Sequence, residues 1–220
     1  HKDTAESDSD SLVEGWAAPE GIPAEPAPLF ESGKVLVHIH DLKARININR
    51  LLDPAGEPDP VHRDLLSRFL SLEEFGLDPG EVDDIIDAVK DWIDADDEVT
   101  GFGVENPFYQ SLPRPYSCRN APLESLEELT LIKGIGDELF YGKGDKPGIS
   151  EFLTIYGDGR ININTAHPFI LRALSEDIDE GAAETMAAYR LDQDNELEDV
   201  SWYRTALGTE VEIIDPGLIL

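Results

Sequence analysis

The sequence predicts an α+β protein in which strand-forming segments near both ends enclose a long helical region. Alternating hydrophobic residues before position 50 are typical of short strands, and hydrophobic residues with helical spacing fill the middle of the chain. Strand-like runs return after residue 210. The 220 residues, 40% of them hydrophobic, fit one core with a large insertion or two modest cores, and we expect two lobes.

The first lobe is expected to begin with helix and to continue into strands. Residues 1–16 are polar apart from three positions, which fits the last turns of a helix, and residues 17–33 are rich in proline and glycine, which favours an extended connector. Two short strands are then predicted from alternation at Val35, Val37 and Ile39, and again at Ile46 and Ile48.

Helix signals dominate the middle of the chain. Asp59–Pro60 and Asp78–Pro79 each place an N-cap residue before a first-turn proline, and hydrophobic residues with helical spacing follow both pairs. Ser125 with Glu128 forms a capping box. Thr165 and Asp179 are predicted caps of two later helices. The last predicted strands cover residues 211–214 and 218–220.

An internal repeat joins distant parts of the chain. The pentapeptide Arg-Ile-Asn-Ile-Asn occurs at residues 45–49 and again at residues 160–164. The alternation places the isoleucines on one face and the asparagines on the other, where their amides can bind backbone groups at a turn. We therefore expect a structural role for the repeat.

The charge excludes several classes of partner. The chain has 47 acidic residues against 17 Lys and Arg, a net charge of -30, which repels nucleic acids and anionic membranes. Residues 129–136 resemble the hairpin of helix-hairpin-helix DNA-binding modules, but too few cations surround them for that function. Cys118 is the only cysteine, which excludes an intrachain disulfide and a multi-thiolate zinc site.

An acidic stretch predicts a metal site. With Asp94 as position one of a calcium loop, Asp96 takes position three, Glu98 position five, Thr100 position seven through its carbonyl, and Glu105 position twelve. Oxygen ligands without nearby His or Cys favour Ca²⁺. The glycine of position six is replaced by valine, so we do not expect an EF-hand proper.

Weaker candidates flank this loop. Asp91 belongs to an acidic helical stripe that also contains Asp84 and Asp87, and such a stripe is otherwise an ordinary solvated face. Asp192 and Asp194 form a second acidic cluster, for which a polar loop is the alternative. No nucleophile elbow or zincin motif occurs, so we expect no enzyme, although a carboxylate-based hydrolase stays open as an alternative.

The ordered motifs resemble the minor pseudopilin K family of the bacterial type II secretion system. They include residues 11–16, the Asn-rich segment 43–52, the acidic stretch 91–98, Pro115–Tyr116, residues 120–123 and 125–129, the Lys133–Gly134 turn and residues 161–166. The resemblance implies a pilin-like lobe, with a helix remnant and a small antiparallel sheet, formed by residues 1–50 and 200–220. It also implies an inserted all-helical domain over residues 51–199.

The same resemblance implies a function. Members of the family are non-enzymatic structural components that cap the pseudopilus tip together with the I-type and J-type minor pseudopilins and bind calcium in the helical domain. By position, Asp94, Asp96 and Glu105 become the first ligand candidates. We expect a periplasmic chain whose full-length form has a hydrophobic N-terminal helix in the inner membrane and a further strand after Leu220. A calcium-stabilised binding module of another function is the alternative.

Overall fold

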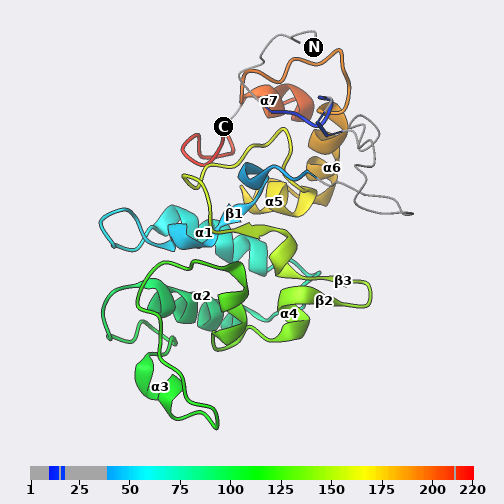
Figure 1. The fold of residues 1–220 in the computed structure, drawn as a ribbon. Helices are drawn as coiled ribbons and strands as arrows, with labels where there is room; N and C mark the ends of the chain where they lie inside the picture. The colour runs from blue at the N-terminus through cyan, green and yellow to red at the C-terminus, as the bar shows by residue number, and fades with distance from the viewer. Residues whose placement is uncertain (1–9, 15, 18–38, 211) are drawn as a thin grey trace, which may run out of the picture.

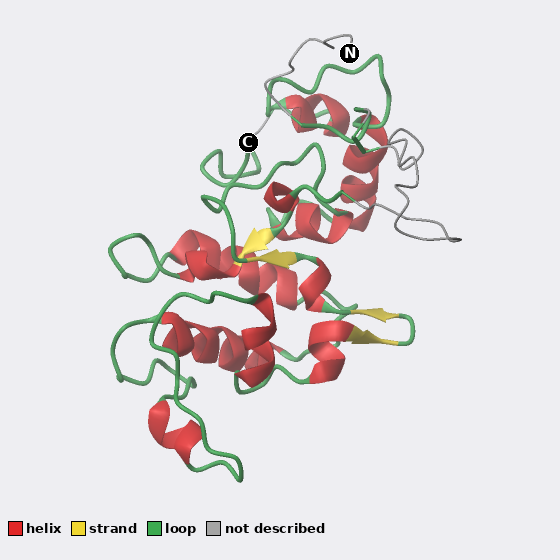
Figure 2. Ribbon diagram, viewed as in Figure 1, coloured by secondary structure: helices red, strands yellow, loops and turns green. Residues whose placement is uncertain are grey.

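The computed structural model describes residues 10–14, 16–17, 39–210 and 212–220. One continuous hydrophobic core runs through these residues. The paired helices α1 (Pro60–Leu70) and α2 (Pro79–Ile93) lie at the centre of the fold, with the last helices packed beyond α1 and the remaining short helices beside α2 (Figure 1). The mixture of many helices with small sheets agrees with the predicted α+β class (Figure 2).

Both predicted caps of the central helices are confirmed. The Asp59 carboxylate accepts hydrogen bonds from the first backbone amides of α1, which begins at Pro60. Asp78 and Glu81 form a complete capping box at the start of α2. Each cap uses backbone N–H groups that have no partner within the helix, so the two start points follow from local sequence alone.

The other helices are short. They are α3 (Asn106–Gln110), α4 (Asp137–Tyr141), α5 (Pro168–Ala173), α6 (Glu180–Tyr189) and α7 (Trp202–Leu207), with 3-10 turns at Leu42–Ala44, Ile48–Leu51, Leu126–Leu131 and Ile149–Glu151. Asp179 caps α6 as predicted, and the Ser125–Glu128 capping box opens a 3-10 turn. The prediction for Thr165 is wrong. Its hydroxyl is bound to Asp41, and the ring of His167 caps α5 instead.

The strands are shorter than predicted, and most of them lie at other positions in the chain. β1 (Ile46–Asn47) pairs in parallel with β4 (Leu153–Thr154), while β2 (Gly142–Lys143) and β3 (Lys146–Pro147) form an antiparallel hairpin. Residues 35–38 lie outside the described residues, and Ile39 belongs to no strand. At the C-terminus, residues 212–214 form no strand and Ile219 makes an isolated parallel bridge to Ile161. The division at residues 50 and 199 stays a prediction.

The repeated pentapeptide has the structural role that its pattern predicted. Asn47 Oδ1 accepts a hydrogen bond from the amide of Asn49, and Asn162 Oδ1 accepts one from the amide of Asn164, so each copy closes the same local turn. The four isoleucines of the repeat are buried. The turn ends the extended backbone at once, which explains why β1 is only two residues long.

Among the described residues, none of the helices has both the length and the hydropathy that a membrane span requires. The helix-hairpin-helix resemblance is explained by packing. Gly134 has φ +92°, and a Cβ at this position would lie 2.8 Å from Cγ1 of Ile85 in α2. The glycine is therefore needed for the close approach of this turn to α2 rather than for contact with phosphate.

Candidate metal centre

The C-terminal half of α2 carries acidic side chains toward the protein interior. Asp87, Asp91 and Asp94 follow one another at helical spacing and retain only 7%, 0% and 4% of their exposure. The alternative of a solvated helix face is therefore wrong for these three residues. Burial of several like charges is costly unless each carboxylate finds donors or a cation.

The loop after α2 provides part of that compensation. It folds back along the helix so that the amide of Thr100 donates to Asp91 Oδ1 over 3.0 Å and the amide of Phe102 donates to Asp87 Oδ2 over 3.1 Å. Two glycines make this approach possible. A Cβ at Gly101 or at Gly103 would lie 2.1 Å from a carboxylate oxygen of Asp87 or Asp91, respectively, so a side chain at either position would force that carboxylate to move.

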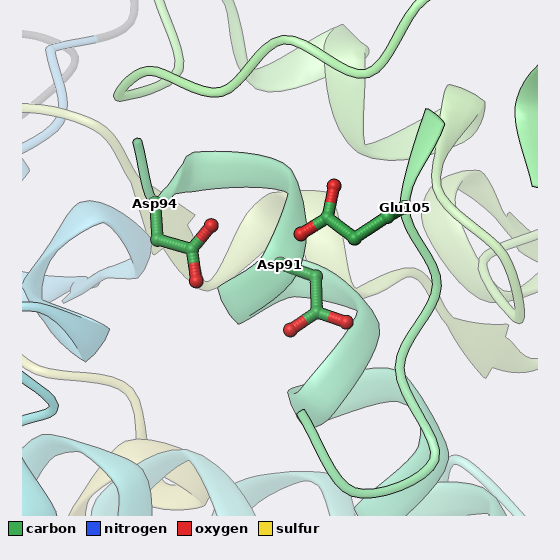
Figure 3. Close-up of side chains that lie close together, drawn as sticks. All are labelled: Asp91, Asp94 and Glu105. Carbon is green, nitrogen blue, oxygen red and sulfur yellow. The ribbon is translucent and has the colours of Figure 1, made fainter. Parts of the chain in front are cut away.

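Past this loop, the chain brings a third carboxylate to the end of α2. Asp91, Asp94 and Glu105 each have a carboxylate oxygen within 4.8 Å of the others, and all three residues are buried. Figure 3 shows the two aspartates at the end of α2 and Glu105 on the returning segment. Both oxygens of Glu105 and Oδ1 of Asp94 are enclosed without a hydrogen-bond partner among the described residues.

The electrostatics of the cluster favour a cation. Burial, followed by the charges of Asp91, Asp94 and Asp97, raises the pKa of Glu105 to about 7. Burial also raises the pKa of Asp91 and of Asp94. Lys90 offers one ammonium group, 2.6 Å from Asp94 Oδ2 and 4.0 Å from Asp91 Oδ1. Three carboxylates against one ammonium leave two negative charges in excess, which a divalent cation would neutralise.

The donor set fits calcium. All candidate ligand atoms are carboxylate oxygens, the type that hard cations prefer. Cys118 lies beside the cluster, but burial and then the charge of Glu105 raise the pKa of its thiol to about 11, so it stays protonated and is a poor metal ligand. The unpartnered oxygens of Asp94 and Glu105 would hold the ion, with Asp91 as the third ligand residue.

The structure brings some of the predicted ligands together and places the others apart. Asp94 and Glu105 lie together with Asp91, which the sequence marks as a weaker candidate. Asp96 and Glu98 are exposed in the loop, and Asp96 Oδ1 accepts the amide of Glu98. The carbonyl of Thr100 accepts the amide of Gly103. Asp96 and Glu98 therefore lie outside the buried group, whereas Thr100 contacts it through its backbone amide, which donates to Asp91.

The second acidic cluster forms a local turn. Asp192 Oδ1 accepts the amide of Asp194 over 3.0 Å, and both side chains are exposed. Among the described residues, neither belongs to a group of three possible ligands close enough to hold an ion. The polar-loop alternative therefore describes this segment.

Two residues that support the site were missed from the sequence. Lys90 could have been found from its spacing of four residues to Asp94 on a helix. Asn120 has φ +49° and donates to the carbonyl of Asp96 and the carboxylate of Asp97, which holds the acidic loop against a distant segment. No local sequence signal marks Asn120 for this role.

Two histidines of the chain, His62 and His167, have structural contacts. His62 Nδ1 lies 3.0 Å from Asp59 Oδ2, and its Nε2 lies 3.3 Å from the carbonyl of Gly159. His167 accepts the amide of Phe169. His38 lies outside the described residues.

Comparison with known proteins agrees with the resemblance found in the sequence. Residues 44–141 match the family model described as type II secretion system (T2SS), protein K, and this segment contains the whole carboxylate cluster. The chain is 29% identical over 134 residues to the putative type II secretion system protein K of Escherichia coli K12, and 28% identical over 143 residues to protein K of Aeromonas hydrophila. The comparisons support type II secretion protein K as the family that this chain resembles. The resemblance predicted from the sequence is thus confirmed.

The two protein K relatives are longer than this chain. Each match covers 59% of the chain but only 38% and 40% of the relatives, respectively. The structural comparison covers a greater length of the chain than the sequence matches do. With a TM-score of 0.67 and 22% identity, the structure aligns over 93% of this chain and 68% of a chain from the GspK-GspI-GspJ complex of enterotoxigenic Escherichia coli. The α+β fold predicted from the sequence is therefore confirmed, and it is similar to the fold of that chain.

Proposed function

We propose that this chain is the periplasmic part of a non-enzymatic minor pseudopilin that caps the type II secretion pseudopilus together with I-type and J-type partners. The observation that carries the proposal is the agreement of fold over 93% of the chain with a component of a GspK-GspI-GspJ complex. The match of residues 44–141 to the protein K family model supports the same function. In this proposal, a hydrophobic helix beyond the present chain anchors the full-length protein in the inner membrane.

The proposal includes bound calcium in the helical region. Its support is the trio Asp91, Asp94 and Glu105, in which three buried oxygens lack a partner among the described residues. An ion that binds only the folded chain adds about 2.7 kcal/mol to its stability at 100 times the dissociation constant. For a chain of this size, that gain corresponds to a rise in melting temperature of about 5–10 °C.

A complex-formation assay tests the tip function. The chain is mixed with the periplasmic domains of the I-type and J-type pseudopilins from the same organism, and the mixture is analysed by size-exclusion chromatography with light scattering. In calcium we expect one peak with the mass of a ternary complex. Three separate peaks in calcium would refute the tip proposal, whatever the outcome for metal binding.

The calcium proposal has its own test. Differential scanning calorimetry with calcium and with a chelator measures the expected rise in melting temperature. Asp94→Asn should abolish the rise, and the matched control Asp96→Asn, in the exposed loop, should preserve it. An equal melting temperature in both buffers for the parent chain would show that the buried cluster holds no calcium.

One observation favours a second candidate function. The carboxylate cluster does not depend on any partner surface, so a calcium-stabilised binding module of another function would contain the same site. Calcium-dependent melting without assembly would favour this alternative. The hydrolase alternative has less support, because the three clustered carboxylates are buried and a substrate could not reach them without rearrangement.

A further inference from the structure

A cavity of about 550 Å³ lies far along the chain from the carboxylate cluster. It is bounded by residues 12 and 16, by the segment 39–45, by the start of α5 and by the end of α6. Its lining combines apolar side chains with two arginines, Arg45 and Arg190. In a chain with 47 acidic residues and 17 Lys and Arg, two arginines at one cavity are an unusual concentration of positive charge.

Arg190 is the more unusual of the two because it is buried and forms no ion pair with any residue that the structure describes. It is 4% exposed at the C-terminal cap of α6, and its Nη1 donates to the carbonyl of Ile163 over 2.9 Å. Its Nε is enclosed and has no acceptor among the described residues. Burial lowers the pKa of Arg190 to about 10, and no carboxylate opposes that effect. An unpaired buried guanidinium is costly, and an anion would relieve the cost.

The neighbouring polar groups also suit an anion. Arg45 forms no ion pair with any described residue. Burial, and then the charge of Arg190, lowers the pKa of His167. The neutral ring accepts the amide of Phe169 through Nδ1, so its proton is on Nε2, which can donate.

Two acidic side chains, Asp41 and Glu151, also line the cavity, and their surroundings differ. The Asp41 carboxylate already accepts from Asn162, from Thr165 and from the amide of Lys43, so its oxygens are held by three donors. Glu151 is exposed to solvent, where its charge is screened. Of the charged side chains that line the cavity, Arg190 is therefore the most buried.

The remaining walls define the body of the ligand. Leu12, Trp16, Ile39, Phe152 and Ile170 contribute apolar surface to the same cavity. We propose that this cavity binds a monocarboxylate with an apolar body, whose carboxylate pairs with Arg190 and Arg45 while its apolar part lies against Trp16 and Phe152. Both a free organic acid and the C-terminal residue of a polypeptide have this chemistry. Pairing of carboxylate with guanidinium is the strongest such interaction available to the site.

The test uses hydrocinnamate and its neutral amide as matched probes. Binding to the calcium-loaded chain is measured by titration of backbone and indole NMR signals, which report weak affinities. We expect hydrocinnamate to shift the Trp16 indole signal and to bind at least about tenfold more tightly than the amide, a difference of about 1.4 kcal/mol. Acetyl-Gly-Gly-Phe with a free or an amidated C-terminus forms the polypeptide arm.

Variants assign the binding to the two arginines. Arg45→Gln removes a charge from a half-buried position and should weaken hydrocinnamate at least about tenfold. Arg190→Lys keeps the charge but removes the Nε–H, and should also weaken binding. Arg114→Gln is the matched control, because this exposed arginine lies outside the cavity and changes the net charge equally.

The outcomes separate clearly. Tighter binding of the free-acid peptide than of hydrocinnamate identifies a polypeptide terminus as the ligand, and the reverse order identifies a small organic acid. Equal affinity for acid and amide, absence of any shift at Trp16, or an Arg45→Gln affinity equal to that of Arg114→Gln would overturn the proposal. These results do not depend on assembly with I-type or J-type partners, so this proposal can fail while the proposed function stands.

Discussion

Replacing Glu105 by glutamine should have opposite effects with and without calcium. The substitution keeps the shape of the side chain but removes its charge. Burial and the nearby aspartates raise the pKa of Glu105 from 4.5 to about 7. A tenfold change in a protonation equilibrium corresponds to about 1.4 kcal/mol, so at about pH 8 the ionised side chain destabilises the metal-free fold by up to about 3 kcal/mol. Glu105→Gln should therefore stabilise the chain in chelator.

In saturating calcium the same substitution should destabilise the chain, because a charged ligand is lost from the ion. The free energy of unfolding is measured by urea denaturation, followed by circular dichroism, in both buffers. Glu98→Gln is the control, since it makes the same chemical change at an exposed position of the same loop. Equal effects of the two substitutions would refute the assignment. Destabilisation of Glu105→Gln in chelator would indicate a structural hydrogen bond instead of an unpaired charge.

Three further outcomes follow from the same contacts. Without metal, the folded chain should gain stability as the pH falls from about 7 toward 4.5, because Glu105 takes up its proton earlier in the folded than in the unfolded state; a flat urea midpoint over this range would contradict this. Gly103→Ala should cost about 1–3 kcal/mol through the clash with Asp91, whereas Gly136→Ala, with open space around it, should cost less in the same denaturation. Asn164→Ala should cost about 1–3 kcal/mol by leaving the buried indole N–H of Trp202 without its acceptor, and an unchanged melting temperature would oppose this.

Local signals in the sequence predicted the helix starts well. The caps at Asp59, Asp78 and Asp179 depend on residues within a few positions of one another, and the structure has all three. The strands were harder to predict. β1 pairs with β4, more than 100 residues away, and its length is limited by the turn that Asn47 closes. The alternation of hydrophobic residues indicates neither which segment a strand pairs with nor where the strand ends.

The candidate site was predicted only in part. The reason is geometric. Calcium-loop spacing selected Asp94 and Glu105, but α2 continues to Ile93, so the third carboxylate comes from helical spacing at Asp91. The loop residues Asp96 and Glu98 point to solvent because the chain turns back only after them. An acidic helix face is buried only if a later segment of the chain packs against it. The spacing of residues along the helix does not indicate whether this happens.

The parallel pairing of β1 with β4 has a consequence for how the chain folds. The contact joins Ile46 to Leu153 and closes a loop of more than 100 residues that contains the carboxylate cluster. Closing such a loop from an unstructured chain costs about 4 kcal/mol in entropy. If the cluster binds its ion while the pair is still open, the ordered helices shorten the effective loop. Calcium would then accelerate refolding as well as slow unfolding, which couples the folding rate to the ion content of the surrounding compartment.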